Sequence, residues 1–179
     1  QQEVKMVKTF AYHPLSVNCQ MVWILLAESG MEEKIDMHKI DDSFQEPSTD
    51  EYRAKFKHAM VPAFDDDGTV VCQSTSIMRY LCRTYEQCAK FYPEDNRTEI
   101  DQMLDYRQGD LYPIIKNASY GNLLGYPGPY QDADGKAFWR AAAIAEFERM
   151  ERLLGDKTFM AGDEVSIADF AIAPSLRFL

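Results

Sequence analysis

The strongest single constraint on the fold is an Asp-Gly turn between two short apolar runs. Residues 61–64 (Val-Pro-Ala-Phe) and 70–72 (Val-Val-Cys) flank the run Asp-Asp-Asp-Gly at 65–68. An Asp-Gly pair between β-forming residues favours a tight hairpin, because both of its residues tolerate the positive φ angles that the turn requires. Two antiparallel strands are therefore predicted here, and they form one edge of a sheet.

The segments around this hairpin alternate between strand and helix patterns. Ser16 precedes a run with apolar residues at helical spacing, and Gly30 stands where a helix would end. Ser74 can cap a later helix in the same way. The predicted strands are 7–12 and 35–40, and the predicted helices are 17–29, 51–57 and 75–85. The β-α-β-α-β-β-α order is the thioredoxin-like arrangement of an α/β domain.

The second half of the chain has a different pattern, with no convincing strand from Asn96 onward. A loop is expected at 125–135, where Gly, Pro and Asp are frequent, and Ser166 with Asp169 forms a capping-box pattern. The predicted helices are 98–124, 137–154 and 170–179. We therefore expect a thioredoxin-like domain at 1–85, a linker at 86–95 and an all-helical domain at 96–179.

Composition limits the possible partners and the compartment. The chain has 29 acidic and 19 basic residues and a formal charge of −10, which repels phosphate backbones and anionic lipid. No stretch approaches the roughly 20 apolar residues of a membrane span, and residues 1–9 lack a secretory apolar run. The four cysteines lack metal-ligand spacing. We expect a cytoplasmic protein with reduced thiols, no metal, and no nucleic-acid or membrane partner.

Four motifs in order resemble the cytosolic glutathione S-transferase superfamily. They are Y-H-P-L-S-V-N-C at 12–19, M-V-P-A-F at 60–64, Q-S-T-S-I-M-R-Y-L at 73–81 and F-M-A-G-D-E-V-S-I-A-D-F at 159–170. The first is similar to the theta-class pattern, in which a serine stands three residues before a cysteine. The chain departs from the family at 56–59, where Phe-Lys-His-Ala replaces Asn-Pro-x-Gly, and at Met60, which replaces a common lysine. Family members usually continue further, so the helical domain is expected to be incomplete.

The resemblance implies glutathione as co-substrate and assigns roles to particular residues. It implies a cis Val61-Pro62 bond, with Met60, Val61 and Pro62 at the cysteinyl part of glutathione; without it, a trans proline that begins a strand is the simpler interpretation. It places Gln73 and Ser74 at the γ-glutamyl carboxylate. In the implied homodimer, Asp101 reaches the ammonium group of a neighbouring subunit's ligand, although an exposed helical acid is a simpler role for it.

The required chemistry can be argued from the residues alone. Glutathione reacts as a thiolate, and bringing a thiol pKa from about 8.5 to neutral pH requires roughly 2.7 kcal/mol. One hydroxyl donor to an ion supplies about 1.5 to 3 kcal/mol, and a helix N-terminus adds about 0.3 to 1 kcal/mol. Ser16 at the start of a helix can meet this requirement. Tyr12 is the alternative donor; the simpler roles are a plain N-cap for Ser16 and a strand aromatic for Tyr12.

These observations predict a glutathione transferase that uses Ser16 to stabilise the thiolate, which then attacks a small, soft electrophile. Two other classes of function remain open. One is a non-catalytic binding or docking module with the same fold. The other is a glutathione-dependent thiol reductase that acts through Cys19, the last residue of an S-x-x-C motif at 16–19 where oxidoreductases carry C-x-x-C.

Overall fold

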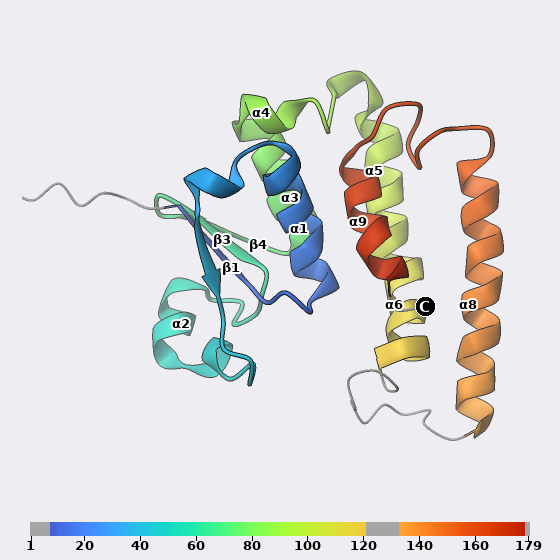
Figure 1. Cartoon of the computed structure of the whole chain (residues 1–179), viewed down its shortest axis with the longest axis horizontal. Helices are drawn as coiled ribbons and strands as arrows, with labels where there is room; N and C mark the ends of the chain where they lie inside the picture. The colour runs from blue at the N-terminus through green and yellow to red at the C-terminus, as the bar shows by residue number, and fades with distance from the viewer. Residues whose placement is uncertain (1–7, 121–132, 178–179) are drawn as a thin grey trace, which may run out of the picture. The chain divides into compact units, whose positions relative to one another are not determined.

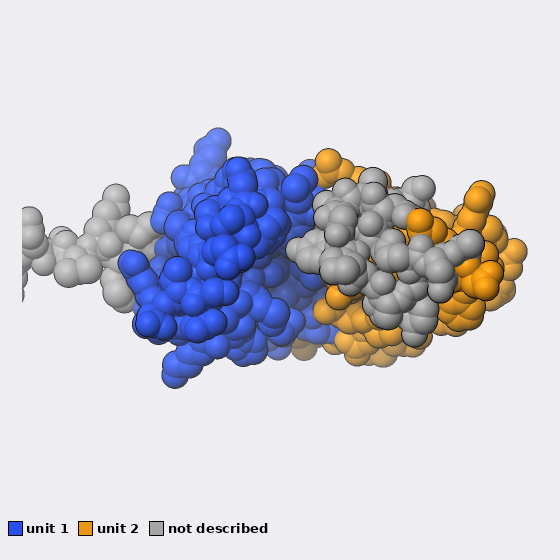
Figure 2. All heavy atoms as spheres, turned by 90° about the horizontal axis from the view of Figure 1, so that it is seen from below, with its two compact units in different colours: residues 1–93 blue, residues 94–179 orange. Residues whose placement is uncertain are grey.

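The computed structural model describes residues 8–120 and 133–177. The chain divides into two compact units, residues 1–93 and residues 94–179 (Figure 2). The first unit contains the whole sheet, and the described part of the second is helical. The segment predicted as a linker contains the short helix α4 (Glu86–Ala89). This helix belongs to the first unit, where the Cys88 Sγ lies 3.3 Å from the Met31 Sδ.

A four-stranded mixed sheet organises the first unit. Its strands lie in the order β2-β1-β3-β4; β1 is parallel to β2 and antiparallel to β3, and β3 is antiparallel to β4. The strands are β1 (Thr9–Tyr12), β2 (Asp36–Lys39), β3 (Ala63–Asp66) and β4 (Thr69–Cys72). The thioredoxin-like α/β fold predicted from the sequence is therefore confirmed. The first two strands are shorter than predicted, β3 is shifted by two residues and β4 begins one residue earlier; Val7, the first residue of the first predicted strand, lies outside the described residues.

The hairpin between β3 and β4 has the predicted two-residue turn. Asp67 and Gly68 have φ angles of 51° and 97°, the positive values of a turn whose twist matches that of the strands. The Gly68 amide donates to the Asp65 carboxylate at 2.8 Å. The turn therefore fixes the register, in which Asp66 pairs with Thr69.

Helices cover both faces of the sheet (Figure 1). On one face, the Tyr12 ring meets Trp23 of α1 (Val17–Glu28), and Phe64 meets Tyr80 of α3 (Ser74–Thr84). Phe10 and Phe64 pair directly across the strands on this face and are fully buried, which stabilises the unit by about 1.5 to 3 kcal/mol for each side chain. This packing aligns the start of α1 with the end of β1.

The opposite face of the sheet packs against α2 (Asp50–Lys55). Because side chains alternate along a strand, Ala11 and Ala63 point away from α1 and toward α2. They form a buried cluster with Ile40, Tyr52 and Phe56. The small alanines on the strands leave room for the two aromatic rings of this helix, whose centroids lie 4.9 Å apart.

Helices make up the described part of the second unit, apart from turns and one isolated bridge between Phe159 and Gly162. The predicted helix at 98–124 is a continuous helical run over 97–120 that includes two π-helical segments; residues 121–124 lie outside the described residues. The elements are α5 (Arg97–Tyr106), η4 (Arg107–Leu111), α6 (Tyr112–Ile115), η5 (Lys116–Tyr120), α8 (Ala133–Leu154) and α9 (Ile167–Leu176). Short 3-10 turns elsewhere are η1 (Glu32–Lys34), η2 (Glu46–Ser48) and η3 (Glu94–Asn96).

The predicted starts of α8, α3 and α9 were wrong, since α9 begins at Ile167 rather than at residue 170, but the capping box predicted before α9 is present. Helix α8 begins at Ala133, so the last three residues of the loop expected at 125–135 are helical; residues 125–132 lie outside the described residues. Helix α3 begins at Ser74 itself, and Gln73 is its N-cap residue. The capping box is present: the Ser166 Oγ accepts from the Ala168 amide at 3.2 Å, and Asp169 accepts from the Ser166 amide at 2.9 Å.

None of the helices within residues 8–120 and 133–177 is both long and apolar enough to span a bilayer.

Candidate functional site

The sheet register brings three segments that are far apart in the sequence to one edge of the first unit. Ala11 of β1 pairs with Ala63 of β3, and Ala63 pairs with Cys72 of β4. Tyr12 follows Ala11, Pro62 precedes Ala63 and Gln73 follows Cys72, so these three neighbours lie at the same edge. The segments predicted to contact glutathione, apart from Asp101, therefore meet at the carboxyl end of β1.

Ser16 begins α1 as its N-cap residue. Its backbone is extended (φ −78°, ψ 115°), and its amide donates to the His13 carbonyl at 3.0 Å. The Ser16 Oγ accepts a long hydrogen bond of 3.4 Å from the Cys19 amide. Because a hydroxyl can donate while it accepts, the half-buried Ser16 side chain keeps a proton to offer an anion at the positive end of a twelve-residue helix.

Tyr12, the alternative donor, is the last residue of β1 and packs among aromatic rings. Its ring is stacked 5.5 Å from Phe10 and meets the edge of Trp23 at 4.9 Å. The Trp23 indole nitrogen in turn donates to Glu32 at 2.8 Å. These contacts give Tyr12 a packing role on the α1 face, while its position at the strand end keeps it at the same edge as Ser16.

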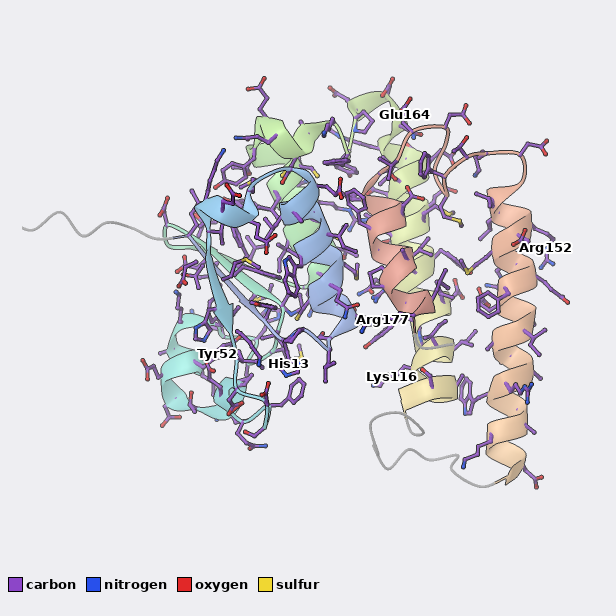
Figure 3. All side chains as sticks on the ribbon, viewed as in Figure 1. His13, Tyr52, Lys116, Arg152, Glu164 and Arg177 are labelled. Carbon is purple, nitrogen blue, oxygen red and sulfur yellow. The ribbon has the colours of Figure 1, made fainter. Side chains whose placement is uncertain are left out.

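The Met60-Val61-Pro62 segment enters β3 through a cis peptide bond between Val61 and Pro62, as the resemblance implied. The Tyr52 hydroxyl of α2 (Figure 3) donates to the Met60 carbonyl at 3.0 Å, and Met60 itself is 54% exposed. Ala59 has a φ of 51°, a conformation that favours the glycine usual in the family at this position. The Tyr52 hydrogen bond thus ties this segment to α2, while the Met60 side chain stays exposed and accessible to a ligand.

Gln73 and Ser74 link the end of β4 to α3. Gln73 is exposed and has φ 72° and ψ 122°, a costly conformation for a residue with a side chain. Ser74 is 3% exposed at the first position of the eleven-residue helix. Helix α3 begins where β4 ends, so its N-terminus lies at the edge that carries Ser16, and the first amides of a helix suit an anion.

Cys19 lacks the properties of a reactive thiol. It is fully buried, and burial raises the pKa of its thiol to about 11, although hydrogen bonds from Ser16 and His13 oppose the shift. The His13 amide donates to its Sγ at 3.4 Å. A catalytic thiol is partly exposed and has a lowered pKa, so these properties oppose the thiol-reductase alternative.

Asp101 is half-buried on α5 in the second unit. Across residues 8–120 and 133–177, no three His, Cys, Asp or Glu side chains gather closely enough to hold a metal ion.

Sequence reasoning missed the residues that support the Ser16 loop. His13 is 2% exposed, and its ring contacts two residues of the loop between β2 and α2. Its Nε2 lies 3.4 Å from the Asp42 Oδ1, and its ring centroid is 3.9 Å from that of Phe44. The available signal was Phe44, an aromatic residue whose sequence neighbours at 41–43 and 45–46 are all polar, because an aromatic side chain in such a loop gains stability by packing against another segment.

Comparison with known families matches both halves of the chain. A model described as "Glutathione S-transferase, N-terminal domain" matches residues 11–89. A second, described as "Glutathione S-transferase, C-terminal domain", matches residues 97–179.

Individual relatives agree with this assignment at low identity. "Glutathione S-transferase theta-1" of Gallus gallus is 28% identical over 116 residues, which are 61% of this chain and 44% of that protein. "Probable maleylacetoacetate isomerase 1" of Drosophila melanogaster is 30% identical over 133 residues, which are 72% of this chain and 51% of the relative. The aligned chain thus spans about half the length of these two relatives.

Solved structures agree with the fold. A delta-class glutathione transferase of Nilaparvata lugens has a TM-score of 0.81 at 26% identity, and the match covers 94% of this chain and 76% of that one. The N-terminal family model matches the first half of the chain and the C-terminal family model matches the second half, so together they cover nearly the whole chain. The chain therefore belongs to the glutathione S-transferase superfamily.

Proposed function

We propose that this protein is a serine-type, theta-like glutathione transferase. Glutathione binds the first unit at the sheet edge, Ser16 stabilises its thiolate, and the thiolate attacks a soft electrophile. One observation carries the proposal: the half-buried Ser16 hydroxyl stands at the N-terminus of α1, at the edge that also carries Val61-Pro62 and Gln73-Ser74. A thiolate donor and two ligand-facing segments thus share one site.

The energetics of this arrangement fit thiol activation. Lowering a thiol pKa from about 8.5 by two units requires roughly 2.7 kcal/mol. A hydroxyl that donates to the thiolate contributes about 1.5 to 3 kcal/mol, and the α1 N-terminus contributes about 0.3 to 1 kcal/mol. The Cys19 amide, which donates to the Ser16 Oγ, polarises that hydroxyl only weakly at 3.4 Å. Ser16 and α1 together therefore reach the required shift without a formal positive charge.

The other proposed contacts hold the tripeptide. The Val61 backbone pairs with the cysteinyl backbone of glutathione as a neighbouring strand would, and membership of the family supports this contact. The exposed Met60 borders the same position. Gln73 and Ser74 receive the γ-glutamyl carboxylate on a hydroxyl and on the first amides of α3. Each proposed contact uses a backbone feature that this chain possesses.

The proposed reaction is a nucleophilic substitution or addition. The thiol proton leaves to solvent, and the thiolate sulfur uses its electron pair to form a carbon–sulfur bond. With an activated aryl chloride, the chloride ion departs with the electrons of the carbon–chlorine bond. The role of Ser16 ends with the stabilised thiolate, so its loss lowers the fraction of reactive glutathione rather than the affinity for the electrophile.

Turnover tests this proposal. We expect the protein to join glutathione to an activated aryl chloride, and Ser16→Ala to lower kcat/KM at pH 7 by about 25-fold, because the thiolate fraction falls from about 0.76 to about 0.03 when the thiol pKa returns from about 6.5 to about 8.5. Ser48→Ala, an exposed serine elsewhere in the unit, is the matched control and should keep wild-type rates. Equal activity in Ser16→Ala and loss in Tyr12→Phe would transfer the role to Tyr12. Glutathione binding without turnover would instead indicate a non-catalytic module.

We also propose that the protein works in the cytoplasm as a homodimer. A formal charge of −10 favours solubility in water, which suits a protein that acts on small molecules. In that dimer Asp101 of one subunit accepts a hydrogen bond from the ammonium group of glutathione bound to the other. The support is the family membership and the position of Asp101 on α5.

A further inference from the structure

His13 anchors the connection between β1 and α1 from within. Its side chain is only 2% exposed, although Leu15, two residues further on, is 48% exposed. The ring Nδ1 accepts from the Leu15 amide at 3.2 Å, and the His13 carbonyl accepts from the Ser16 amide at 3.0 Å. These two bonds fix the backbone that leads to Ser16 (Figure 3 labels His13 on this connection).

The other side of the His13 ring faces the loop between β2 and α2. Because Nδ1 accepts a hydrogen bond, the neutral ring carries its proton on Nε2. That Nε2 lies 3.4 Å from the Asp42 Oδ1, and the ring rests against Phe44. Within the described part of the chain Nε2 has no hydrogen bond of ordinary geometry, so the Asp42 carboxylate is the acceptor in reach of a buried donor.

Asp42 is suited to this contact because it remains ionised. The carboxylate is 78% exposed and pairs with the Lys39 Nζ at 2.8 Å. The Lys39 hydrogen bond, with a smaller contribution from His13, holds the pKa of Asp42 below its usual range. The charged groups around the His13 ring are thus Asp42 and, behind it, Lys39, while the Cys19 thiol that meets the His13 amide stays neutral.

We propose that His13 is a positioning residue that, together with Asp42, clasps the β2–α2 loop to the β1–α1 loop and holds the Ser16 hydroxyl in place for thiolate stabilisation. This inference rests on the proposed function of Ser16. The His13–Asp42 clasp touches neither glutathione nor the reacting sulfur in this scheme. It acts through the Ser16 backbone, which the His13 carbonyl holds directly.

Two variants separate the clasp from general folding effects. Asp42→Ala removes an exposed carboxylate, so the fold should survive. His13→Asn keeps an acceptor near the Leu15 amide but does not reach Asp42. The matched control is Asp36→Ala, an exposed aspartate at the first position of β2, at the far end of the strand from Asp42. The Ser16→Ala variant measures the full contribution of the hydroxyl.

The first measurement is amide hydrogen exchange at Ser16 in the protein without ligand. We expect exchange to become faster in Asp42→Ala and His13→Asn and to stay at the wild-type rate in Asp36→Ala, because the hydrogen bond to the His13 carbonyl opens more often when the clasp is lost. Wild-type exchange in both clasp variants would overturn the inference.

The second measurement is kinetic. In both clasp variants we expect kcat with an activated aryl chloride to fall by about three- to tenfold while the KM for glutathione changes by less than about twofold. If Ser16→Ala loses activity but both clasp variants keep wild-type kcat, the inference is wrong and the proposed function stands. If Ser16→Ala has no effect or glutathione does not bind, the proposed function fails separately. In that case the exchange rates of the Ser16 amide alone test whether the His13–Asp42 clasp holds the β1–α1 loop.

Discussion

Ala59 has a backbone conformation that a glycine adopts more readily. Its φ of 51° lies in the left-handed region, which costs a residue with a Cβ about 1 to 2 kcal/mol. Glycine avoids this cost but loses about 0.5 to 1 kcal/mol through the greater freedom of the unfolded chain. Ala59→Gly should therefore raise the free energy of unfolding by about 0.5 kcal/mol in urea titration. Ala54→Gly, inside α2, is the control and should lower it by about 1 kcal/mol.

Cys19 should resist alkylation in the folded protein. Burial raises the pKa of its thiol to about 11, so the thiolate is scarce at pH 7 to 8 and no surface is open to a reagent. We expect iodoacetamide to modify Cys72, which is half-buried, before Cys19, as peptide mass spectrometry would show. Rapid native modification of Cys19, or a mixed disulfide with glutathione at that residue, would revive the reductase hypothesis.

Single residues of the candidate site were predictable where local chemistry alone determines them. Ser16 was predicted as an N-cap because a serine before a periodic apolar run satisfies helix amides, and α1 begins there. The positive φ of Gln73 gave no sequence signal, because its strain depends on the surrounding structure. The approach of Asp42 and Phe44 to His13 was also missed, because it depends on how two loops meet. The catalytic and binding roles remain predictions.

Among the elements, the sheet end opposite the candidate site carries a polar network. Asp66 at the end of β3 accepts from the hydroxyls of Tyr80 and Tyr85 at 2.7 and 2.6 Å, and it pairs with Lys8 beside β1. Burial favours the neutral carboxyl, but the bonds from Lys8 and the two tyrosines outweigh it and hold the pKa of Asp66 below its usual range. The network joins β3 to α3 and to Lys8, the residue before β1.

The direction of this pKa shift predicts an acid-sensitive contribution to stability. A carboxyl with a lowered pKa in the folded state stabilises the fold above its unfolded pKa, near 3.9, and loses this contribution as the pH falls through the folded pKa. Asp66→Asn should therefore lower the free energy of unfolding by about 2 kcal/mol at pH 7. The difference from wild type should shrink as urea titrations are repeated below about pH 4.

The neighbouring Asp67 provides the control for this experiment. It is more exposed and lies 3.1 Å from the Lys8 Nζ, so Asp67→Asn should change stability by less than about 1 kcal/mol at either pH. Asparagine also tolerates the φ of 51° at this turn position. A pH-independent difference for Asp66→Asn would show that packing, rather than the carboxylate, is what the substitution removes.

Elements were predictable where turn and cap residues agree with the periodic pattern. The Asp67-Gly68 turn fixed the hairpin correctly, and the predicted Ser166–Asp169 box is present at the start of α9. Composition misled at the start of α8, where Asp134 and Gly135 suggested a loop but lie in the first turn of the helix. The π-helical segments η4 and η5 were also not predicted.

At the scale of the whole molecule, the proposed dimer makes a mass prediction. The chain has a mass of 20.6 kDa, so light scattering at micromolar concentration should give twice that value. The proposed role of Asp101 requires a second subunit, because it assigns that residue to a neighbour's ligand. In a dimer, Asp101→Asn should weaken glutathione binding while Asp105→Asn, on the same helix, does not. A monomer that binds glutathione would contradict the Asp101 proposal.

The division of the chain into two units was partly predictable from the sequence. The change from alternating strands to helices was visible in the sequence, and the structure divides the chain at residues 93 and 94. Helix α4 was hidden in the expected linker because four residues are too few to show a helical period. The electrophile is not specified by any motif, because soft-electrophile selectivity depends on the shape of a pocket rather than on a fixed set of reactive groups.

The ionisation of bound glutathione is the most direct test of whether Ser16 stabilises the glutathione thiolate. A pH titration of the thiolate absorbance, with glutathione saturating the protein, gives the pKa of the bound thiol in wild type and in Ser16→Ala. We expect a wild-type pKa near or below neutrality, and a value about two units higher in Ser16→Ala with glutathione still bound. A bound thiol that ionises at the same low pH in both proteins would contradict the role of Ser16 and make Tyr12→Phe the next variant to titrate.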